Sequence, residues 1–113
     1  MIITGKELRM DELKEMAERS FGNMVKAVVD VRRGLIAIDA ELHSDLESLL
    51  LQDGSKQKDL WGINLYPELE GGEFVEFDSM INMRPSQGNR SRGVESALLR
   101  DKISSIVQEK IRR

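Results

Sequence analysis

The segment from Met24 to Leu42 constrains the fold most strongly, because apolar and polar residues alternate on both sides of one turn signal. The turn signal is Arg33-Gly34, since glycine readily adopts the positive φ angle that a two-residue hairpin turn requires. With this turn, the apolar residues of both strands fall on one face: Val25, Ala27, Val29, Val31, Ile36, Ile38, Ala40 and Leu42. A shift of one residue would mix the apolar and polar sets, so the pattern predicts a hairpin in which Arg32 pairs with Leu35.

A second pair of alternating runs, Leu60 to Tyr66 and Phe74 to Met83, predicts a second hairpin. One face of it is mostly apolar and carries Trp61, Ile63, Leu65, Val75, Phe77, Ser79, Ile81 and Met83. The opposite face carries Asn64, Glu76, Asp78 and Asn82. The two hairpins therefore share one design, with an apolar face that another layer must cover.

Three helices are predicted by apolar residues at helical spacing and by capping signals. The first runs from Met10 to Phe21, and Gly22 ends it. The second follows the sequence Ser44-Asp45-Leu46-Glu47, which has the pattern of a capping box. The third begins near Glu95 or Ser96 and reaches Ile111.

The resulting order αββαββα predicts an α+β protein. Each hairpin must bury its apolar face, and helices are the elements available to cover it. We therefore expect a two-layer sandwich with one four-stranded, mostly antiparallel sheet and three helices on one face. A length of 113 residues fits a single domain spanning residues 1–113.

The composition excludes several classes of protein. The net charge of −3 and the pI near 5.2 argue against a general nucleic-acid coat, although a local basic patch is compatible with them. The absence of cysteine excludes disulfides and cysteine-based zinc sites. No signal peptide or membrane span is recognisable, so we expect a cytoplasmic protein without a membrane partner. The sequence predicts no cofactor and does not indicate the oligomeric state.

The most unusual segment is the arginine-rich loop, residues 84–93, which reads RPSQGNRSRG. No acidic residue lies between Ser79 and Val94, so this stretch carries three positive charges in an acidic chain. It also directly precedes the last helix, whose N-terminus attracts anions. The residues expected to hold an anionic ligand are Arg84, Ser86, Gly88, Asn89, Arg90, Arg92 and Gly93.

Arginines crowded beside the positive end of a helix require a negative partner. The partner is either an external phosphate or carboxylate, or an internal acid to which the loop is clamped. The acids on the predicted polar sheet face are the internal candidates, namely Asp30, Asp39, Glu41, Glu76 and Asp78. The sequence leaves both readings open.

Part of this acidic face also suggests a metal-dependent enzyme as an alternative. Asp39, Glu41 and Asp78, with His43, are hard-ligand residue types that suit Mg²⁺ or Mn²⁺. Such an enzyme would be a hydrolase or transferase acting on a phosphorylated substrate, with the arginines binding the phosphate. A solvated face is the simpler reading, and no catalytic or metal-binding residue is assigned.

Several strings resemble a family of small prokaryotic proteins of unknown function. The most specific are WGINLYP, residues 61–67, and RPSQGNRSRG, residues 84–93, and the likeness covers nearly the whole chain. The resemblance implies no activity, substrate or cofactor. Our leading hypothesis is thus a cytoplasmic binding protein for an anionic small molecule or nucleic-acid phosphate, and a structural or oligomeric module is a further alternative.

Overall fold

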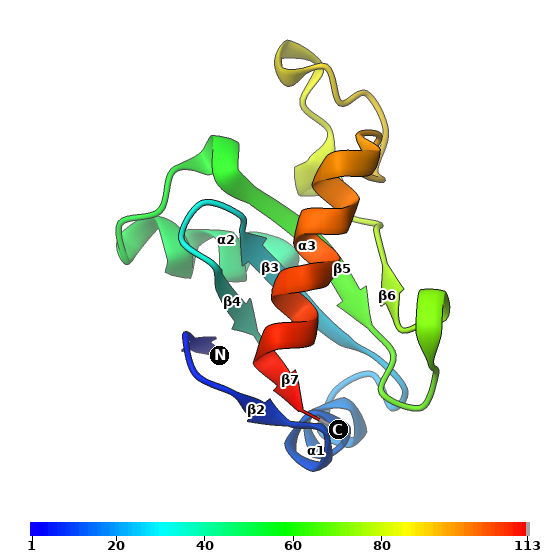
Figure 1. Cartoon of the computed structure of the whole chain (residues 1–113). Helices are drawn as coiled ribbons and strands as arrows, with labels where there is room; N and C mark the ends of the chain where they lie inside the picture. The colour runs from blue at the N-terminus through cyan, green and yellow to red at the C-terminus, as the bar shows by residue number, and fades with distance from the viewer. Residues whose placement is uncertain (113) are drawn as a thin grey trace.

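The computed structural model describes residues 1–112 and shows an α+β protein built on a five-stranded antiparallel sheet (Figure 1). The strand order is β1-β4-β3-β5-β6. The strands of this sheet are β1 (Ile2–Thr4), β3 (Val25–Asp30), β4 (Leu35–Ile38), β5 (Leu60–Leu65) and β6 (Val75–Glu76). The helices are α1 (Met10–Arg19), α2 (His43–Gln52) and α3 (Ala97–Lys110). The predicted fold class, the three helices and the antiparallel sheet are confirmed.

The helices cover both faces of the sheet, so the expected two-layer arrangement is wrong in this respect. Helices α1 and α3 pack on the face formed by Ala27, Val29, Ile36 and Ile38, which is the larger core. Helix α2 packs through Leu46 and Leu50 on the opposite face (Figure 1). Its partners there are Val28, Ala37 and Leu60, which the alternating pattern placed on the polar face. Their apolar side chains need a cover of their own, and α2 supplies it.

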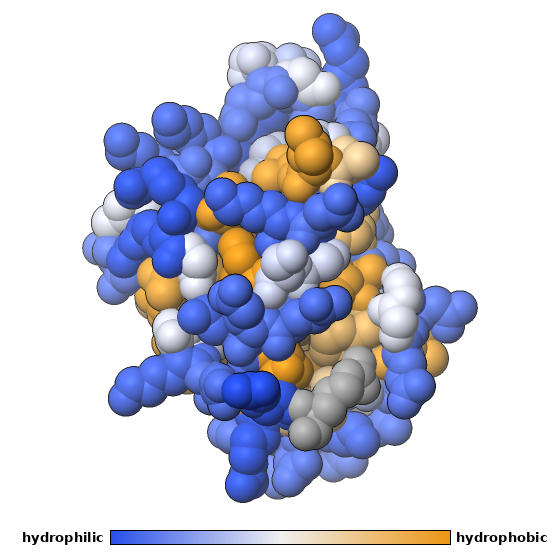
Figure 2. All heavy atoms as spheres, viewed as in Figure 1, coloured by the Kyte–Doolittle hydropathy of each residue, from blue (hydrophilic) through white to orange (hydrophobic). Residues whose placement is uncertain are grey.

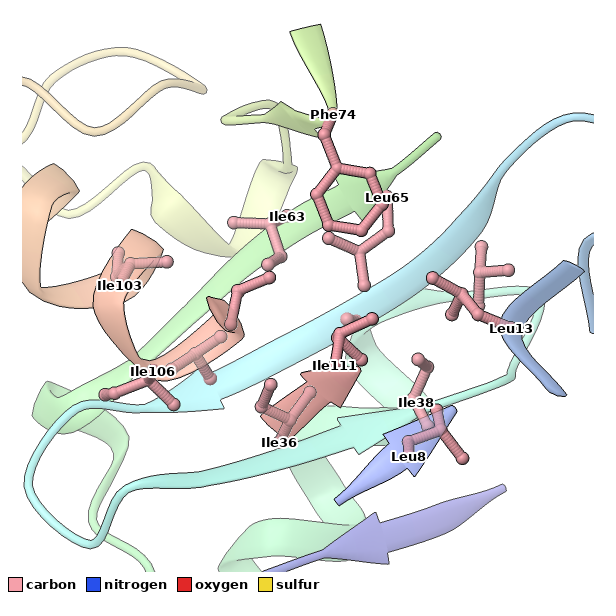
Figure 3. Close-up of a cluster of buried hydrophobic side chains, with 14 of the residues drawn as sticks. Leu8, Leu13, Ile36, Ile38, Ile63, Leu65, Phe74, Ile103, Ile106 and Ile111 are labelled. Carbon is pink, nitrogen blue, oxygen red and sulfur yellow. The ribbon is translucent and has the colours of Figure 1, made fainter. Parts of the chain in front are cut away.

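The larger core lies between the sheet and the two helices α1 and α3. Figure 3 shows aliphatic side chains from strands, helices and both ends of the chain converging there. Leu13 of α1, Ile63 of β5 and Ile103 of α3 are completely buried. This packing fixes α3 across the sheet and thereby sets the place where the arginine-rich loop leaves the fold.

The N-terminal residues form a fifth strand, which the sequence analysis did not anticipate. Strand β1 pairs with β4, with Ile3 opposite Ala37. A further short strand, β2 (Leu8–Arg9), lies parallel to β7 (Ile111–Arg112) and joins the two ends of the chain. Two- or three-residue strands contain too few alternations to be visible as a pattern.

The first hairpin has the predicted faces but a different turn. Asp30 pairs with Leu35, so four residues rather than two form the turn. The cause is the Asp30 carboxylate, whose Oδ1 accepts hydrogen bonds from the N–H groups of Arg32 and Arg33, both at 2.9 Å. Because the register moves by two residues, the side chains of β3 and β4 stay on their predicted faces. The prediction is wrong beyond Ile38, where β4 ends: Ala40 packs against the cluster on the α2 face and Leu42 is exposed.

The second hairpin is much shorter than expected, since β6 contains only Val75 and Glu76. The chain then leaves the sheet edge and lies against β5 without forming a strand. A Cβ atom on Gly62 would lie 2.6 Å from Cβ of Ser79, so this approach requires glycine at position 62. The segment that would have continued the strand forms short 3₁₀ turns, Met80–Asn82 and Pro85–Gln87.

The helices begin and end close to their expected positions. Ser96 caps α3, and its Oγ accepts a hydrogen bond from the Leu99 N–H at 3.2 Å. Helix α2 begins at His43 without a side-chain cap, so the expected capping box at Ser44 is wrong. Among residues 1–112, no helix combines the length and the apolar character needed to cross a membrane.

Candidate functional site

The arginine-rich loop begins as a tight, internally bonded turn. The N–H of Arg84 donates to the carbonyl of Asn89 at 2.7 Å, and the N–H of Asn89 donates back at 3.1 Å. Gly88 closes the turn with a φ angle of 80°, in the left-handed region that favours glycine. The four residues between Arg84 and Asn89, which include Ser86, are exposed to solvent.

Arg84 is directed into the protein rather than toward a ligand. Its guanidinium donates to the carbonyls of Ile81 at 3.0 Å and Gln57 at 2.8 Å, and also to the carbonyl of Leu60. It lies over the Trp61 ring, 4.6 Å from the centroid, and 3.9 Å from a carboxylate oxygen of Glu47. Burial lowers the pKa of Arg84, and the Glu47 charge opposes that change. Arg84 therefore clamps the loop to β5.

Two buried asparagines hold the rest of the loop. Asn82 bonds to both backbone groups of Gly62, accepting at 2.8 Å and donating at 2.9 Å, and also donates to the Arg92 carbonyl at 2.9 Å. Asn89 donates to the carbonyls of Asn82 at 2.7 Å and Gly93 at 2.8 Å. Asn89 thus shapes the loop from inside, and its side chain has no polar group turned to solvent, since Oδ1 accepts from Glu95 N–H at 2.9 Å.

Glu95 occupies the backbone anion site that the loop forms. Its carboxylate accepts hydrogen bonds from the N–H groups of Arg90, at 2.5 Å, and Ser91, at 3.0 Å. These bonds lower the pKa of Glu95, and the Arg90 charge lowers it further. The Ser96 hydroxyl caps the start of α3 by accepting a hydrogen bond from the Leu99 N–H. The N-terminus of α3, expected to attract an external anion, therefore has an internal one beside it.

The remaining two arginines lie at the surface. Arg92 is paired with Asp78, with Nε of Arg92 2.7 Å from Oδ1 of the carboxylate. The side chain of Arg90 is exposed and makes no hydrogen bond or ion pair within residues 1–112. Gly93 is half-buried, and a Cβ atom there would come 3.4 Å from the Phe77 carbonyl. The two hypotheses for the loop thus apply to different residues. Arg84 and Arg92 have internal acidic partners, whereas the side chain of Arg90 is exposed to solvent.

Two lysines lie on the segment that contacts the tip of the loop. Gln87 Nε2 donates to the Lys58 carbonyl at 3.2 Å, so the tip of the loop lies against residues 56–58. Lys56 and Lys58 are exposed, and neither has an acid within ion-pair distance in the described part of the chain. We call Lys56, Lys58 and Arg90 the basic patch. The sequence analysis missed the lysines because nothing in their local pattern links them to a loop 30 residues later.

The residues of the expected acidic face are not brought together. Asp30 caps its own hairpin turn, Asp78 pairs with Arg92, and Glu41 is exposed. Asp39 has a φ angle of 76°, a left-handed conformation at the point where the chain turns from β4 toward α2. Among residues 1–112 no three His, Asp or Glu side chains are grouped so that they can hold a metal ion. The geometry therefore gives no support to the metal-dependent alternative.

A separate polar cluster lies on the α2 face, at the end of β5. Asn64 stands between Lys26 of β3 and Glu76 of β6 in the sheet register. Its Nδ2 donates to Glu76 at 2.9 Å, and Tyr66 donates to the same carboxylate oxygen at 3.0 Å. His43, the first residue of α2, is buried nearby, with Nε2 donating to the Ile63 carbonyl at 2.8 Å.

The buried His43 makes the stability of the fold depend on pH. Burial lowers the pKa of His43 from its ordinary value of 6.5, and the charges of Lys26 and Arg92 lower it further, while the Ile63 bond and Asp78 raise it. As the pH falls through the pKa that His43 has in the unfolded chain, the unfolded chain binds a proton at His43 and the folded chain does not. The free energy of unfolding therefore decreases.

Replacing His43 with glutamine retains a donor for the Ile63 carbonyl and removes the titration. We expect the wild-type protein to lose more stability than His43→Gln when the pH is lowered from about 8 to about 5. Urea unfolding at a series of pH values measures the two slopes. Parallel slopes for the two proteins would contradict the assignment of a depressed pKa to His43.

Comparison with known proteins extends over almost the entire chain. Residues 1–110 match the family described as "Protein of unknown function (DUF5674)". No curated protein and no solved structure matches the chain. The resemblance to an uncharacterised family, drawn from the loop and strand motifs, is confirmed by this match: the chain belongs to the family described as "Protein of unknown function (DUF5674)".

Proposed function

We propose that this chain is a small binding protein that holds an anionic ligand, phosphate-bearing or carboxylate, at the basic patch beside the arginine-rich loop. The observation that carries the proposal is the exposed positive charge of Lys56, Lys58 and Arg90, none of which has a salt-bridge partner among residues 1–112. The other two arginines of the loop, Arg84 and Arg92, face the carboxylates of Glu47 and Asp78. The exposed Ser86 supplies a further hydroxyl donor on the loop, and Gly88 beside it leaves open space at the backbone.

The rigidity of the loop supports this function. A flexible loop would lose conformational entropy when it orders around a ligand, and that loss would weaken binding. Here Arg84, Asn82 and Asn89 fix the backbone in the absence of a ligand. The arginine-rich loop therefore serves as a preformed support, and its buried polar residues position the ligand contacts without making them.

The chemistry of the patch favours phosphate groups. Lysine ammonium groups act as mobile point charges, and an exposed guanidinium adds a planar pair of donors that matches a phosphate or carboxylate edge. The patch is local, because the whole chain carries a net charge of −3. Binding of this kind weakens as salt is added. We assign the cytoplasm as its setting because a chain without cysteine does not depend on an oxidising compartment.

Titrations with pyrophosphate, citrate and a short oligouridylate at low salt test the proposal. We expect at least one of these anions to raise the melting temperature, by the amount that mass action gives for a ligand of the folded state. The combined variant Lys56→Ala, Lys58→Ala and Arg90→Ala is expected to lose that response while its melting temperature without ligand changes little.

A matched control removes the same charge elsewhere on the surface. Lys6, Lys14 and Lys102 are exposed, lie outside both the loop and residues 56–58, and take part in no ion pair of the described residues. The control variant with alanine at these positions should keep the full response. The proposal fails if none of the three anions stabilises the protein, or if the control loses the response to the same extent as the patch variant.

A further inference from the structure

The edge of the sheet at β6 has an open flank. The Tyr66 N–H donates to the Phe74 carbonyl at 2.9 Å, so residues 66 and 74 form a hydrogen-bonded pair. Bonded and non-bonded pairs alternate in antiparallel sheets, which makes Leu65 and Val75 a non-bonded pair. The N–H and C=O of Val75 therefore point away from β5. Within residues 1–112 no other strand covers this flank, because β6 is the last strand of the sheet.

A cavity lies directly beside this edge. It has a volume of about 480 Å³ and is bounded by Val75 and Phe77 on one side and by Val107 and Ile111 on the other. Ser104 and Gln108 of α3 supply polar groups to its wall. The volume and the mixture of apolar walls with a few polar groups are typical of sites that receive an organic group.

The chain segment that forms this edge carries only negative charges. Glu68, Glu70, Glu73 and Glu76 are all exposed, and no lysine or arginine occurs between Leu60 and Met83. Glu76 is engaged by Asn64 and Tyr66, but the other three glutamates have no ion-pair partner among residues 1–112. An occupant of this edge must therefore satisfy backbone groups, fill an apolar space and carry positive charge.

We propose that the β6 edge and the adjoining cavity form a docking site for an extended, basic segment of a partner protein, which adds a strand to the sheet and places one bulky apolar side chain in the cavity. Strand addition satisfies the outward backbone groups of Val75. Alternate side chains of an added strand point to the same face of the sheet, so one of them enters the space between β6 and α3. Lysine or arginine on either side of it then lies close to the glutamates.

This site is distinct from the basic patch, which lies on and beside the arginine-rich loop and has the opposite charge. The two sites therefore recognise different chemistry. A failure of anion binding leaves the docking site unaffected, and a failure of peptide binding leaves the basic patch unaffected.

The probe is a blocked heptapeptide of alternating lysine and valine with a central phenylalanine. We expect it to bind with chemical-shift changes at the Val75 amide and at the Val107 methyl groups. The same peptide with glutamate in place of lysine should bind about tenfold more weakly or worse, because it meets like charges. Two further peptides carry N-methyl groups on alternate backbone amides, the first on the odd-numbered and the second on the even-numbered residues. An added strand pairs through only one of its two edges, so only one of these peptides should lose binding.

Substitutions in α3 test the cavity. Ser104→Trp fills it from the helix side and is expected to weaken peptide binding about tenfold, a difference readily resolved in a titration. Ser105→Trp, at the next position and outside the cavity wall, is the matched control and should bind as the wild type does.

Each alternative occupant gives a different result. Equal binding of the basic and acidic peptides overturns the requirement for positive charge, and no loss with either N-methylated peptide overturns strand addition. Binding that survives Ser104→Trp shows that the cavity takes no side chain. If the protein self-associates, the peptide does not reverse this association and Ser104→Trp abolishes it, the edge binds a second copy of the chain. The proposal is then wrong.

Discussion

Replacing Asn82 with alanine is expected to destabilise the protein by about 3–5 kcal/mol, because each buried backbone group left without a partner costs about 1–3 kcal/mol. The Asn82 side chain is completely buried and bonds to three backbone groups, Gly62 N–H, Gly62 C=O and Arg92 C=O. The Arg92 carbonyl also accepts from the Ser79 N–H at 2.9 Å, so the loss falls mainly on the two backbone groups of Gly62. For a domain of this size the melting temperature should fall by about 12–20 °C.

Thermal and urea unfolding of Asn82→Ala measure this loss directly. Asn23→Ala is the matched control, since Asn23 is exposed and makes no side-chain hydrogen bond among residues 1–112. A surface substitution of this kind usually changes stability by about 0.5 kcal/mol or less. If the free energy of unfolding of Asn82→Ala is no lower than that of Asn23→Ala, the described network does not hold the loop to β5.

Replacing Arg84 with methionine is expected to cost a similar amount, about 3–5 kcal/mol, the range measured when one partner of a buried charged group is removed. Methionine fills a comparable space over Trp61 but donates no hydrogen bond. The carbonyls of Leu60 and Ile81 then lose the Arg84 donor, and the Gln57 carbonyl keeps only the Leu60 N–H. Glu47 keeps a largely buried charge without a counter-ion. The substitution should therefore loosen the loop and lower the stability of the whole domain.

Arg90→Met is the control for this prediction, because it removes the same charge from the same loop. Arg90 is exposed, and its effect on the free energy of unfolding should be within about 0.5 kcal/mol. The pair of variants separates the two roles of the loop arginines. Equal losses for Arg84→Met and Arg90→Met would show that both side chains, and not Arg84 alone, support the fold.

The sequence was most informative about which face each strand residue occupies. The alternation predicted the face of each residue of β3 and β4 correctly even though the turn has a different length, but not those of Ala40 and Leu42, which lie beyond the end of β4. A register error of two residues leaves the faces unchanged, so alternation cannot detect it. Nor could alternation show that Asp30 would bond to its own turn, since that depends on one side-chain rotamer.

The placement of α2 was wrong for a related physical reason. Val28 and Ala37 lie among polar residues in the alternating pattern, so they looked like isolated apolar residues on a solvated face. In the sheet they are cross-strand partners, and together with Leu60 they form a patch large enough to bind a helix. Pairing between strands brings such residues together, and a single-strand pattern does not contain that information.

The candidate site was partly predictable. The crowded positive charge of the loop indicated correctly that negative partners are required. Which partners they are depends on distances between segments far apart in the chain, as in the pairs Arg92–Asp78 and Arg84–Glu47. Lys56 and Lys58 could be added to the patch only after the contact between Gln87 and Lys58 was known.

The parallel pairing of β2 with β7 has a consequence for how the protein folds. Lys110 donates to the Gly5 carbonyl across a separation of 105 positions, and Leu8 and Ile111 belong to the same core. Contacts of such long range close late, because a large loop must lose its freedom first. During synthesis the ribosome must release the last helix and strand before this core can be completed. Until then the growing chain exposes apolar surface, because residues such as Leu8 pack against residues that are synthesised about 100 positions later, such as Ile111.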